Sequence, residues 1–286
     1  MSEKSIKLKI GNKKYDIISD DDYLPQMRSG LKSWLINLAK ILLQRNGFEP
    51  KMVRLFQTLI KDSDTVIDIG ANIGCTSLLF GELAQQVVSF EPSPSTFALL
   101  SQNIARSQLP NIELYNCALG SSKMTSQITY AKSNRSGGFV ANKTTIKIDH
   151  ITEKIQVEKL DNLIQELNIN QVDFIKIDVE GFELEVIKGA IEVITKFQPI
   201  VVLELNHWCL NALQRISVPD FLDYLLSIFP ILYAIEDGNY ADLHDEDYRY
   251  KVMYNHIINF KFSNLVAAFN QEQLSNFFAN YQPDTY

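Results

Sequence analysis

Short apolar runs alternate with amphipathic stretches through the middle of the chain. The apolar runs predict strands at 65–69, 87–91, 112–117, 173–178 and 200–205. Between and after them, apolar residues recur with helical spacing, which predicts helices at 74–85, 94–107, 161–168, 183–196 and 218–228. Strands that alternate with helices are typical of a mostly parallel sheet covered by helices on both faces. The hydrophobic pattern therefore predicts an α/β fold.

The segment before this alternation has a different pattern. Residues 1–18 are predicted to form a strand pair, followed by a helix from Leu24 to Leu42 and a second helix at 51–60. We assign residues 1–61 to an N-terminal arm with helices, which could form a lid or a dimer face, although ordinary packing is the simplest interpretation. Residues 62–286 are assigned to the main domain.

Later segments add further elements. Residues 126–130 predict a short added strand, and 133–138 predict a mobile substrate loop or a plain solvated turn. Two strands are predicted at 231–235 and 256–260, with the acidic stretch 242–247 as a solvated loop between them. The tail predicts a packed final helix from its apolar residues Phe269, Leu274, Phe277, Phe278 and Tyr281.

One strand-to-helix junction carries the strongest chemical signal. The first strand breaks into a turn that contains Gly70 and Gly74, and the second strand ends in Glu91, followed by Pro92 and Ser93. In such a unit the backbone of the turn approaches a ligand, while an acid at the tip of the second strand accepts hydrogen bonds from ribose hydroxyls. The junction therefore predicts a cofactor that contains a nucleoside.

The residues of the turn distinguish between two kinds of cofactor. A nicotinamide dinucleotide fold uses a third, middle glycine, but here Ala71, Asn72 and Ile73 separate the two glycines. Asp68 lies just before the turn, where a carboxylate would repel a pyrophosphate and attract a cation. S-adenosylmethionine carries a sulfonium and an ammonium group and no phosphate. We therefore predict S-adenosylmethionine, bound around Asp68, the glycine turn and Glu91, with a nicotinamide-dependent oxidoreductase as the alternative.

A second group of polar residues lies at the end of a later strand. This strand contains Lys176 and is followed by Asp178 and Glu180. Charges in a buried parallel strand cost free energy unless they are paired. Because open α/β sheets bind ligands at the carboxyl ends of their strands, we place Asp178 and Glu180 beside the methyl donor and its acceptor.

The next strand ends in the same way, in Glu204, Asn206 and His207. His207 is the best histidine candidate for a general base, because the pKa of imidazole lies near neutrality, and Asp178 and Glu180 are the other candidates. The oxygen atoms of Asp178, Glu204 and Asn206 would suit magnesium or calcium. Three side chains on two strand ends are a weak signal, so a divalent metal is an option that we do not favour.

Composition and charge exclude several classes of function. The net charge of −7 argues against a general nucleic-acid binder and against an anionic membrane surface. No apolar run approaches the length that spans a bilayer, and the first residues lack the apolar core of a secretory signal. Cys75, Cys117 and Cys209 are far apart and suit buried residues in a reducing compartment. We therefore expect a cytoplasmic protein that does not insert into a membrane.

Five short segments form a set that occurs together in one family of enzymes. They are residues 68–74, 90–92, 116–119, 175–183 and 188–190. Together they resemble the FkbM family of S-adenosylmethionine-dependent methyltransferases, over roughly residues 62–207. The run Ile-Lys-Ile-Asp-Val-Glu-Gly at 175–181 is the most distinctive segment, since many methyltransferases share the glycine turn.

The resemblance implies a class I methyltransferase fold, with a mostly parallel seven-stranded sheet that includes one antiparallel strand. Asn116, Cys117 and Ala118, at the end of the third strand, are then expected to border the adenine. The family implies O-methylation of a small-molecule acceptor, such as a sugar, a polyketide or a peptide-like metabolite. Two further possibilities stay open at this point. The protein could form a homodimer through the N-terminal helices, or it could be a non-catalytic binding module with the same fold.

Overall fold

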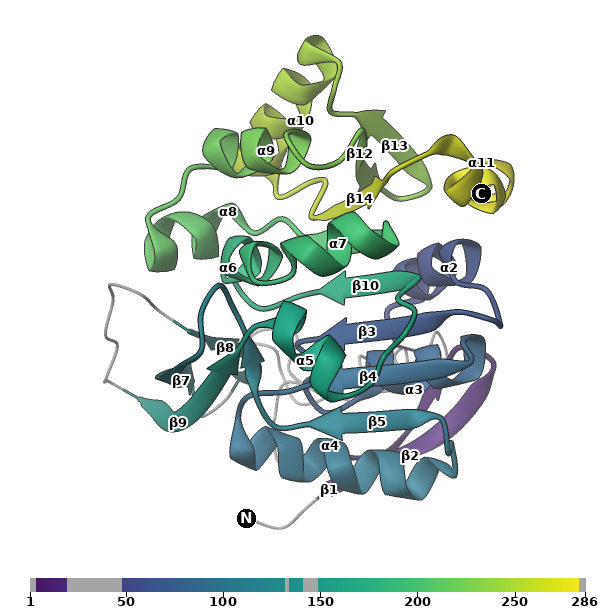
Figure 1. Cartoon of the computed structure of the whole chain (residues 1–286), viewed down its shortest axis with the longest axis vertical. Helices are drawn as coiled ribbons and strands as arrows, with labels where there is room; N and C mark the ends of the chain where they lie inside the picture. The colour runs from purple at the N-terminus through teal and green to yellow at the C-terminus, as the bar shows by residue number, and fades with distance from the viewer. Residues whose placement is uncertain (1–3, 20–47, 132–133, 141–148, 283–286) are drawn as a thin grey trace, which may run out of the picture.

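The computed structural model describes residues 4–19, 48–131, 134–140 and 149–282 (Figure 1). The helix predicted from Leu24 to Leu42 lies outside these residues. The predicted strand pair near the N-terminus is confirmed as the hairpin of β1 (Lys4–Ile10) and β2 (Lys13–Ser19). The predicted helix at 51–60 is confirmed as α2 (Pro50–Leu59), with a proline in its first turn.

The main sheet contains eight strands in the order β13-β12-β14-β11-β10-β3-β4-β5. The five strands from β11 to β5 run parallel, and β14 lies antiparallel between β11 and β12. The expectation of seven strands was wrong by one, because β13 adds a hairpin to the edge of β12. The bounds are β3 (Thr65–Ile69), β4 (Gln86–Phe90), β5 (Ile112–Tyr115), β10 (Phe174–Ile177), β11 (Ile200–Glu204), β12 (Ile231–Glu236), β13 (Asn239–Asp242) and β14 (Asn264–Ala268).

Helices cover both faces of this sheet, as predicted, and each face has its own apolar cluster. One face packs against α2, the β1–β2 hairpin, α3 (Cys75–Leu83), α4 (Pro94–Ser107) and α11 (Ser275–Asn280). The other packs against α5 (Leu160–Glu166), α6 (Glu183–Lys188), α7 (Ile191–Phe197), α9 (Val218–Leu226) and α10 (Glu246–Asn259), of which α5 and α7 lie in front in Figure 1.

The predicted helix at 183–196 is divided into α6 and α7. Gly189 ends α6, and a Cβ atom at this position would lie 1.9 Å from the carbonyl oxygen of Gly120. The chain therefore needs a glycine here, and this close approach lets the neighbouring loop pack against the end of the helix.

A second, four-stranded sheet stands beside the carboxyl end of the main sheet (Figure 1). Its order is β6-β9-β7-β8, with bounds β6 (Ala118–Leu119), β7 (Met124–Ala131), β8 (Asn134–Phe139) and β9 (His150–Glu158). The short strand predicted at 126–130 is the centre of β7. The loop predicted at 133–138 was wrong over its described residues, because residues 134–139 form β8, which pairs with β7 across an irregular register.

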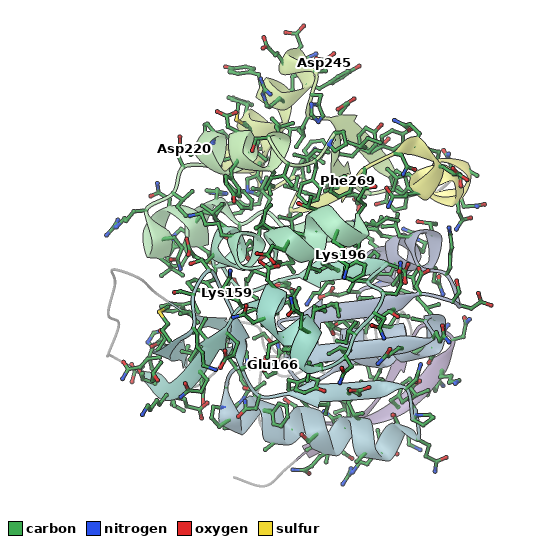
Figure 2. All side chains as sticks on the ribbon, viewed as in Figure 1. Lys159, Glu166, Lys196, Asp220, Asp245 and Phe269 are labelled. Carbon is green, nitrogen blue, oxygen red and sulfur yellow. The ribbon has the colours of Figure 1, made fainter. Side chains whose placement is uncertain are left out.

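The strand predicted at 256–260 was also wrong, because residues 246–259 form helix α10. The Asp245 side chain, labelled in Figure 2, accepts hydrogen bonds from the backbone N–H groups of Asp247 and Tyr248 and so caps the helix. The acidic residues that suggested a solvated loop thus stabilise a helix N-terminus. β12 pairs instead with β14, which starts at Asn264, and with β13 on its other side.

The remaining short helices lie in the last third of the chain. A helical turn α8 (His207–Cys209) leads into the π-helix η1 (Leu210–Gln214), and the 3₁₀ turn η2 (Gln271–Leu274) precedes α11. Within the described residues, every helix is too short or too polar to cross a bilayer.

Three phenylalanine rings join the helices of one face to the sheet. Phe56 of α2, Phe80 of α3 and Phe174 of β10 meet edge to face, with centroids 4.9–6.0 Å apart, and each is at most 1% exposed. Aromatic pairs in this geometry add to the free energy gained by burying their apolar area.

We predict that Phe174→Ala lowers the free energy of unfolding by about 3–5 kcal/mol, because it leaves a cavity between two helices and the sheet. Urea unfolding followed by circular dichroism measures the change. The control is Tyr250→Ala, whose ring is 67% exposed on α10. If Phe174→Ala lowers the free energy of unfolding no more than the control does, the packing of these three rings is contradicted.

Candidate active site

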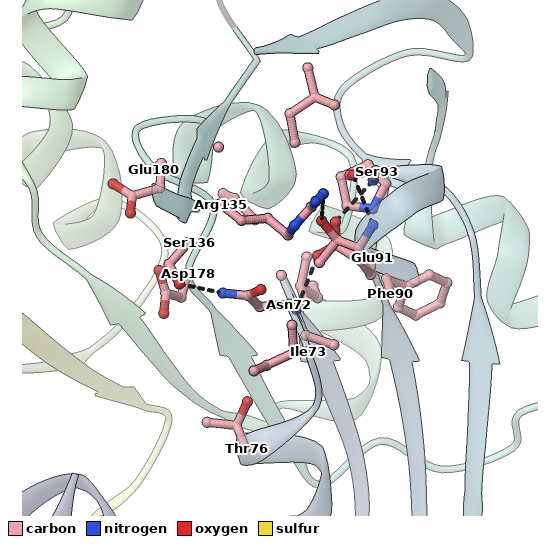
Figure 3. A pocket seen from close by; sticks show the side chains of 18 of the residues that line it. Asn72, Ile73, Thr76, Phe90, Glu91, Ser93, Arg135, Ser136, Asp178 and Glu180 are labelled. Carbon is pink, nitrogen blue, oxygen red and sulfur yellow. Dashed lines mark hydrogen bonds between the residues drawn. The ribbon is translucent and has the colours of Figure 1, made fainter. Parts of the chain in front are cut away.

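A cavity of about 560 Å³ lies at the carboxyl ends of β3, β4, β10 and β11, between the main sheet and the small sheet (Figure 3). Its walls come from both sheets and from the turns that follow the strands. The sequence-predicted residues that line it are Gly70, Ala71, Asn72, Glu91, Pro92, Ser93, Cys117, Ala118, Asp178 and Glu180. Folding thus brings together residues that are up to 110 positions apart in the chain.

The glycine turn forms the floor of this cavity. Gly70 has φ +82°, and a Cβ atom on it would lie 1.9 Å from the carbonyl oxygen of Asp178. The N–H groups of Gly70 and Ala71 both donate to the carbonyl oxygen of Phe90, at 3.0 Å. Gly74 does not line the cavity. It precedes α3 with φ +96°, a left-handed conformation that favours glycine.

Glu91 follows β4 and is 6% exposed. Its carboxylate accepts hydrogen bonds from the backbone N–H groups of Asn72, at 3.0 Å, and Ser93, at 2.9 Å. Burial raises the pKa of Glu91 to about 7, although these two hydrogen bonds favour the ionised form. The carboxyl group is therefore held in one orientation at the cavity wall and titrates near neutral pH.

A buried lysine connects the two strands that carry the predicted acids. Lys176 Nζ lies 3.5 Å from Asp68 Oδ1 and 3.4 Å from Asp178 Oδ2, and it donates to the Gly70 carbonyl at 3.1 Å. Burial disfavours the charged ammonium, but the carboxylates of Asp178 and Asp68 outweigh this cost and raise the pKa of Lys176. Asp68 is fully buried beneath the cavity and also accepts from Ser77 Oγ at 2.7 Å.

Three carboxylates form an acidic wall on the side of β10 and β11. Asp178, Glu180 and Glu204 each place a carboxylate oxygen within 4.8 Å of the other two. Burial and the negative charge of Asp178 raise the pKa values of Glu180 and Glu204. A further acid, Glu49, precedes α2 and also lines the cavity, where burial raises its pKa.

This acidic wall bears on the question of a metal. Asp178 and Glu204 lie together, as expected, but the third predicted ligand, Asn206, instead donates to Glu180 Oε2 at 3.3 Å. The carboxylates present would suit a hard cation such as magnesium. Acidic residues also gather in this way without an ion, so the cluster by itself does not indicate a metal site.

Two further predicted residues lie outside the cavity lining. Asn116 Nδ2 donates to the carbonyl oxygens of Glu91, at 2.8 Å, and Pro92, at 3.1 Å. It therefore stabilises the segment that follows β4. His207 Nδ1 lies 3.2 Å from His256 Nε2, and its ring also packs on Phe260. This geometry gives no support to His207 as a general base, because its polar contact is another histidine.

Sequence reasoning missed several residues of the cavity, above all Arg135 and Tyr130. Arg135 Nη1 donates to Ser95 Oγ at 2.5 Å and to the Tyr130 hydroxyl at 3.0 Å, and its Cζ lies 4.8 Å from the centre of the Tyr130 ring. Figure 3 shows its guanidinium directed toward Ser93 and Glu91. The sequence signal that could have identified Arg135 is its position as the one charged residue in the segment 133–138, which is otherwise made of serine, asparagine and glycine.

The family model of the methyltransferase FkbM domain matches residues 68–250. This match covers more than half of the chain and includes the glycine turn, Glu91 and the acidic wall. The protein therefore belongs to the FkbM family of methyltransferases.

Similarity to curated proteins agrees with this assignment. The chain is 26% identical to Methyltransferase 1 of Beauveria bassiana over 146 residues, covering 45% of this chain and 59% of that protein. It is 30% identical over 141 residues to the hexuronic acid methyltransferase AglP of Haloferax volcanii, covering 49% and 56%. It is 28% identical over 163 residues to the 2-O-methyltransferase NoeI of Sinorhizobium fredii, covering 51% and 65%. The chain thus spans less than two thirds of the length of each of these relatives.

We predict that Lys176→Met lowers the free energy of unfolding by about 3–5 kcal/mol, because it leaves Asp68 buried without its cation. Thermal and urea unfolding measure this change. The double variant Asp68→Asn, Lys176→Met removes both charges and should recover part of the loss. If the double variant is as unstable as the sum of the two single variants, the ion pair does not couple the strands.

Proposed function

We propose that this methyltransferase uses S-adenosylmethionine and methylates an oxygen atom, either a hydroxyl or a carboxylate, of a sugar or a specialised metabolite. The single observation that carries the proposal is the cavity in which the glycine turn, Glu91 and the acidic wall face one another. Its volume of about 560 Å³ is suitable for a cofactor and the reacting part of an acceptor. The assignment to the FkbM family supports the same cofactor.

The residues of the cavity fit the chemistry of this cofactor. Glu91 would accept hydrogen bonds from the ribose hydroxyls, since its carboxylate is fixed by Asn72 and Ser93. Asp178 and Glu49 would attract the positive sulfonium and ammonium groups. Cys117 and Ala118 would border the adenine at the end of β5.

When bound, S-adenosylmethionine supplies an already activated methyl group, so the protein chiefly aligns the acceptor and excludes water. A hydroxyl acceptor must also lose a proton, and Glu180 is the best-placed base. Its side chain lines the cavity and accepts from Asn206 Nδ2 and Cys209 Sγ, and its backbone has the unusual φ of +53°. Burial raises its pKa, which makes its carboxylate a stronger base than an ordinary glutamate.

The names of the relatives support an oxygen acceptor on a sugar-like molecule. One is a hexuronic acid methyltransferase and another a 2-O-methyltransferase. A carboxylate acceptor would need no general base, whereas a hydroxyl acceptor would. The requirement for Glu180 therefore separates the two reactions.

The first test is cofactor binding by calorimetry. Glu91 must be ionised to accept hydrogen bonds from ribose, and burial raises its pKa to about 7 in the free protein. We predict that the dissociation constant of S-adenosylhomocysteine is constant above pH 8 and rises by about tenfold per pH unit below 7, because binding must then remove a proton.

Glu91→Gln is the matched variant for this test. It should bind S-adenosylhomocysteine at least about tenfold more weakly at pH 8, since a hydrogen bond to a charged group contributes about 1.5–3 kcal/mol. It should also lose the pH dependence below 7. Unchanged affinity in Glu91→Gln would refute the ribose assignment. Binding of NADH with no binding of S-adenosylhomocysteine would favour the oxidoreductase alternative.

For a hydroxyl acceptor, we predict that Glu180→Gln lowers kcat by about 10²–10⁴ and leaves the affinity for S-adenosylhomocysteine unchanged. Release of S-adenosylhomocysteine is followed with neutral hexosides and with uronic acids as acceptors. Glu192→Gln, on the exposed surface of α7, is the control. Full activity of Glu180→Gln on neutral hexosides would exclude Glu180 as the base.

A further inference from the structure

Strand β8 forms part of the cavity wall, although it belongs to the small sheet. Arg135 and Ser136 line the cavity, and so does Val140 just beyond the strand. Asn72 Nδ2 of the glycine turn donates to Ser136 Oγ at 3.0 Å, and Gln214 Nε2 of η1 donates to the Val140 carbonyl at 2.6 Å. The strand is thus attached to two separate parts of the main domain and lies against the site.

Arg135 is directed toward one end of the cavity. Besides Ser95 and Tyr130, its Nη1 donates to Thr96 Oγ1 at 3.3 Å, in the first turn of α4. In Figure 3 the guanidinium points toward Ser93 and Glu91 and away from Asp178 and Glu180. Arg135 therefore lies at the end where we place the ribose, and the acidic wall lies at the other end.

The same end is linked to Ser136 through Asn72. The Asn72 backbone N–H donates to the Glu91 carboxylate, while its side chain donates to Ser136. Asn72 has φ +51°, a left-handed conformation that asparagine adopts more readily than most residues. One residue thus connects the proposed ribose acid to strand β8.

The methionine part of the cofactor also carries a carboxylate, which a guanidinium would attract, so position and charge together decide which part of the cofactor Arg135 contacts. Arg135 points toward Glu91, where we place the ribose, and away from the acidic wall, where we place the methionine part. The sulfonium and ammonium groups are positive and would be repelled by a guanidinium but attracted to Asp178 and Glu49. The adenosine part is uncharged, and a guanidinium can stack on the base or donate to ribose and ring acceptors. An arginine at this end is therefore suited to adenosine.

We propose that Arg135, positioned by its contacts with Ser95, Thr96 and Tyr130 and carried by β8, binds the adenosine part of the cofactor, so that the small sheet is a cofactor-binding element. This inference rests on the proposed use of S-adenosylmethionine. Ser136 supports Asn72 and through it Glu91, and acts as a positioning residue. The acceptor would then be selected at the acidic end of the cavity and not by β8.

The test is calorimetry on the full chain with two probes, S-adenosylhomocysteine and adenosine, for the wild type and three variants. Arg135→Met removes the guanidinium, and Arg135→Lys keeps the charge but loses the planar group. Lys154→Met is the control, because it removes a positive charge from an exposed position on β9 of the same sheet. Thermal unfolding of every variant shows whether the fold is retained.

We expect Arg135→Met to raise the dissociation constants of both probes by a similar factor of about ten or more, because it removes one charge-assisted hydrogen bond. Arg135→Lys should be intermediate, and Lys154→Met should bind like the wild type. Loss of S-adenosylhomocysteine affinity with unchanged adenosine affinity would overturn the assignment. So would unchanged binding of both probes in Arg135→Met. If the wild type itself binds neither probe, the proposed cofactor is wrong, and this inference with it.

Discussion

The positive charge of Lys176, enclosed within the sheet, holds the two halves of the site together. Lys176 and Asp68 are register partners on β10 and β3, so their ion pair bridges adjacent strands. The same ammonium fixes the Gly70 carbonyl and lies beside Asp178. A charge buried this deeply costs free energy unless it is compensated, and here the compensating groups come from β3, the glycine turn and the acidic side of the cavity. One side chain, that of Lys176, therefore ties the position of the glycine turn to that of Asp178.

Residues that act at the ends of buried strands could be predicted from the sequence. A strand such as β3 is short, buried and mostly apolar, so an acid within it or just beyond it stands out. The geometry of parallel sheets then places these acids at one edge, without any knowledge of distant contacts. This is why Gly70, Glu91, Asp178 and Glu180 were found, and why each lies at the cavity.

Residues whose place depends on contacts with another element could not be predicted in this way. The serines and glycines near Arg135 have the local preferences of a loop, and they form β8 only because β7 supplies a partner strand. His207 satisfied the same strand-end rule as the true cavity residues, but its ring meets His256 from α10. Because residues 256–260, which include the end of α10, were predicted as a strand, this contact could not be foreseen.

The added strand β13 has a consequence for how the molecule meets other chains. A sheet edge with unpaired backbone groups can recruit a strand from another molecule, and six-residue β12 would be such an edge. β13 occupies that position, is only four residues long, and ends at the exposed Asp242. Short edges that carry a charge disfavour intermolecular strand pairing, so the hairpin protects this side of the enzyme from aggregation.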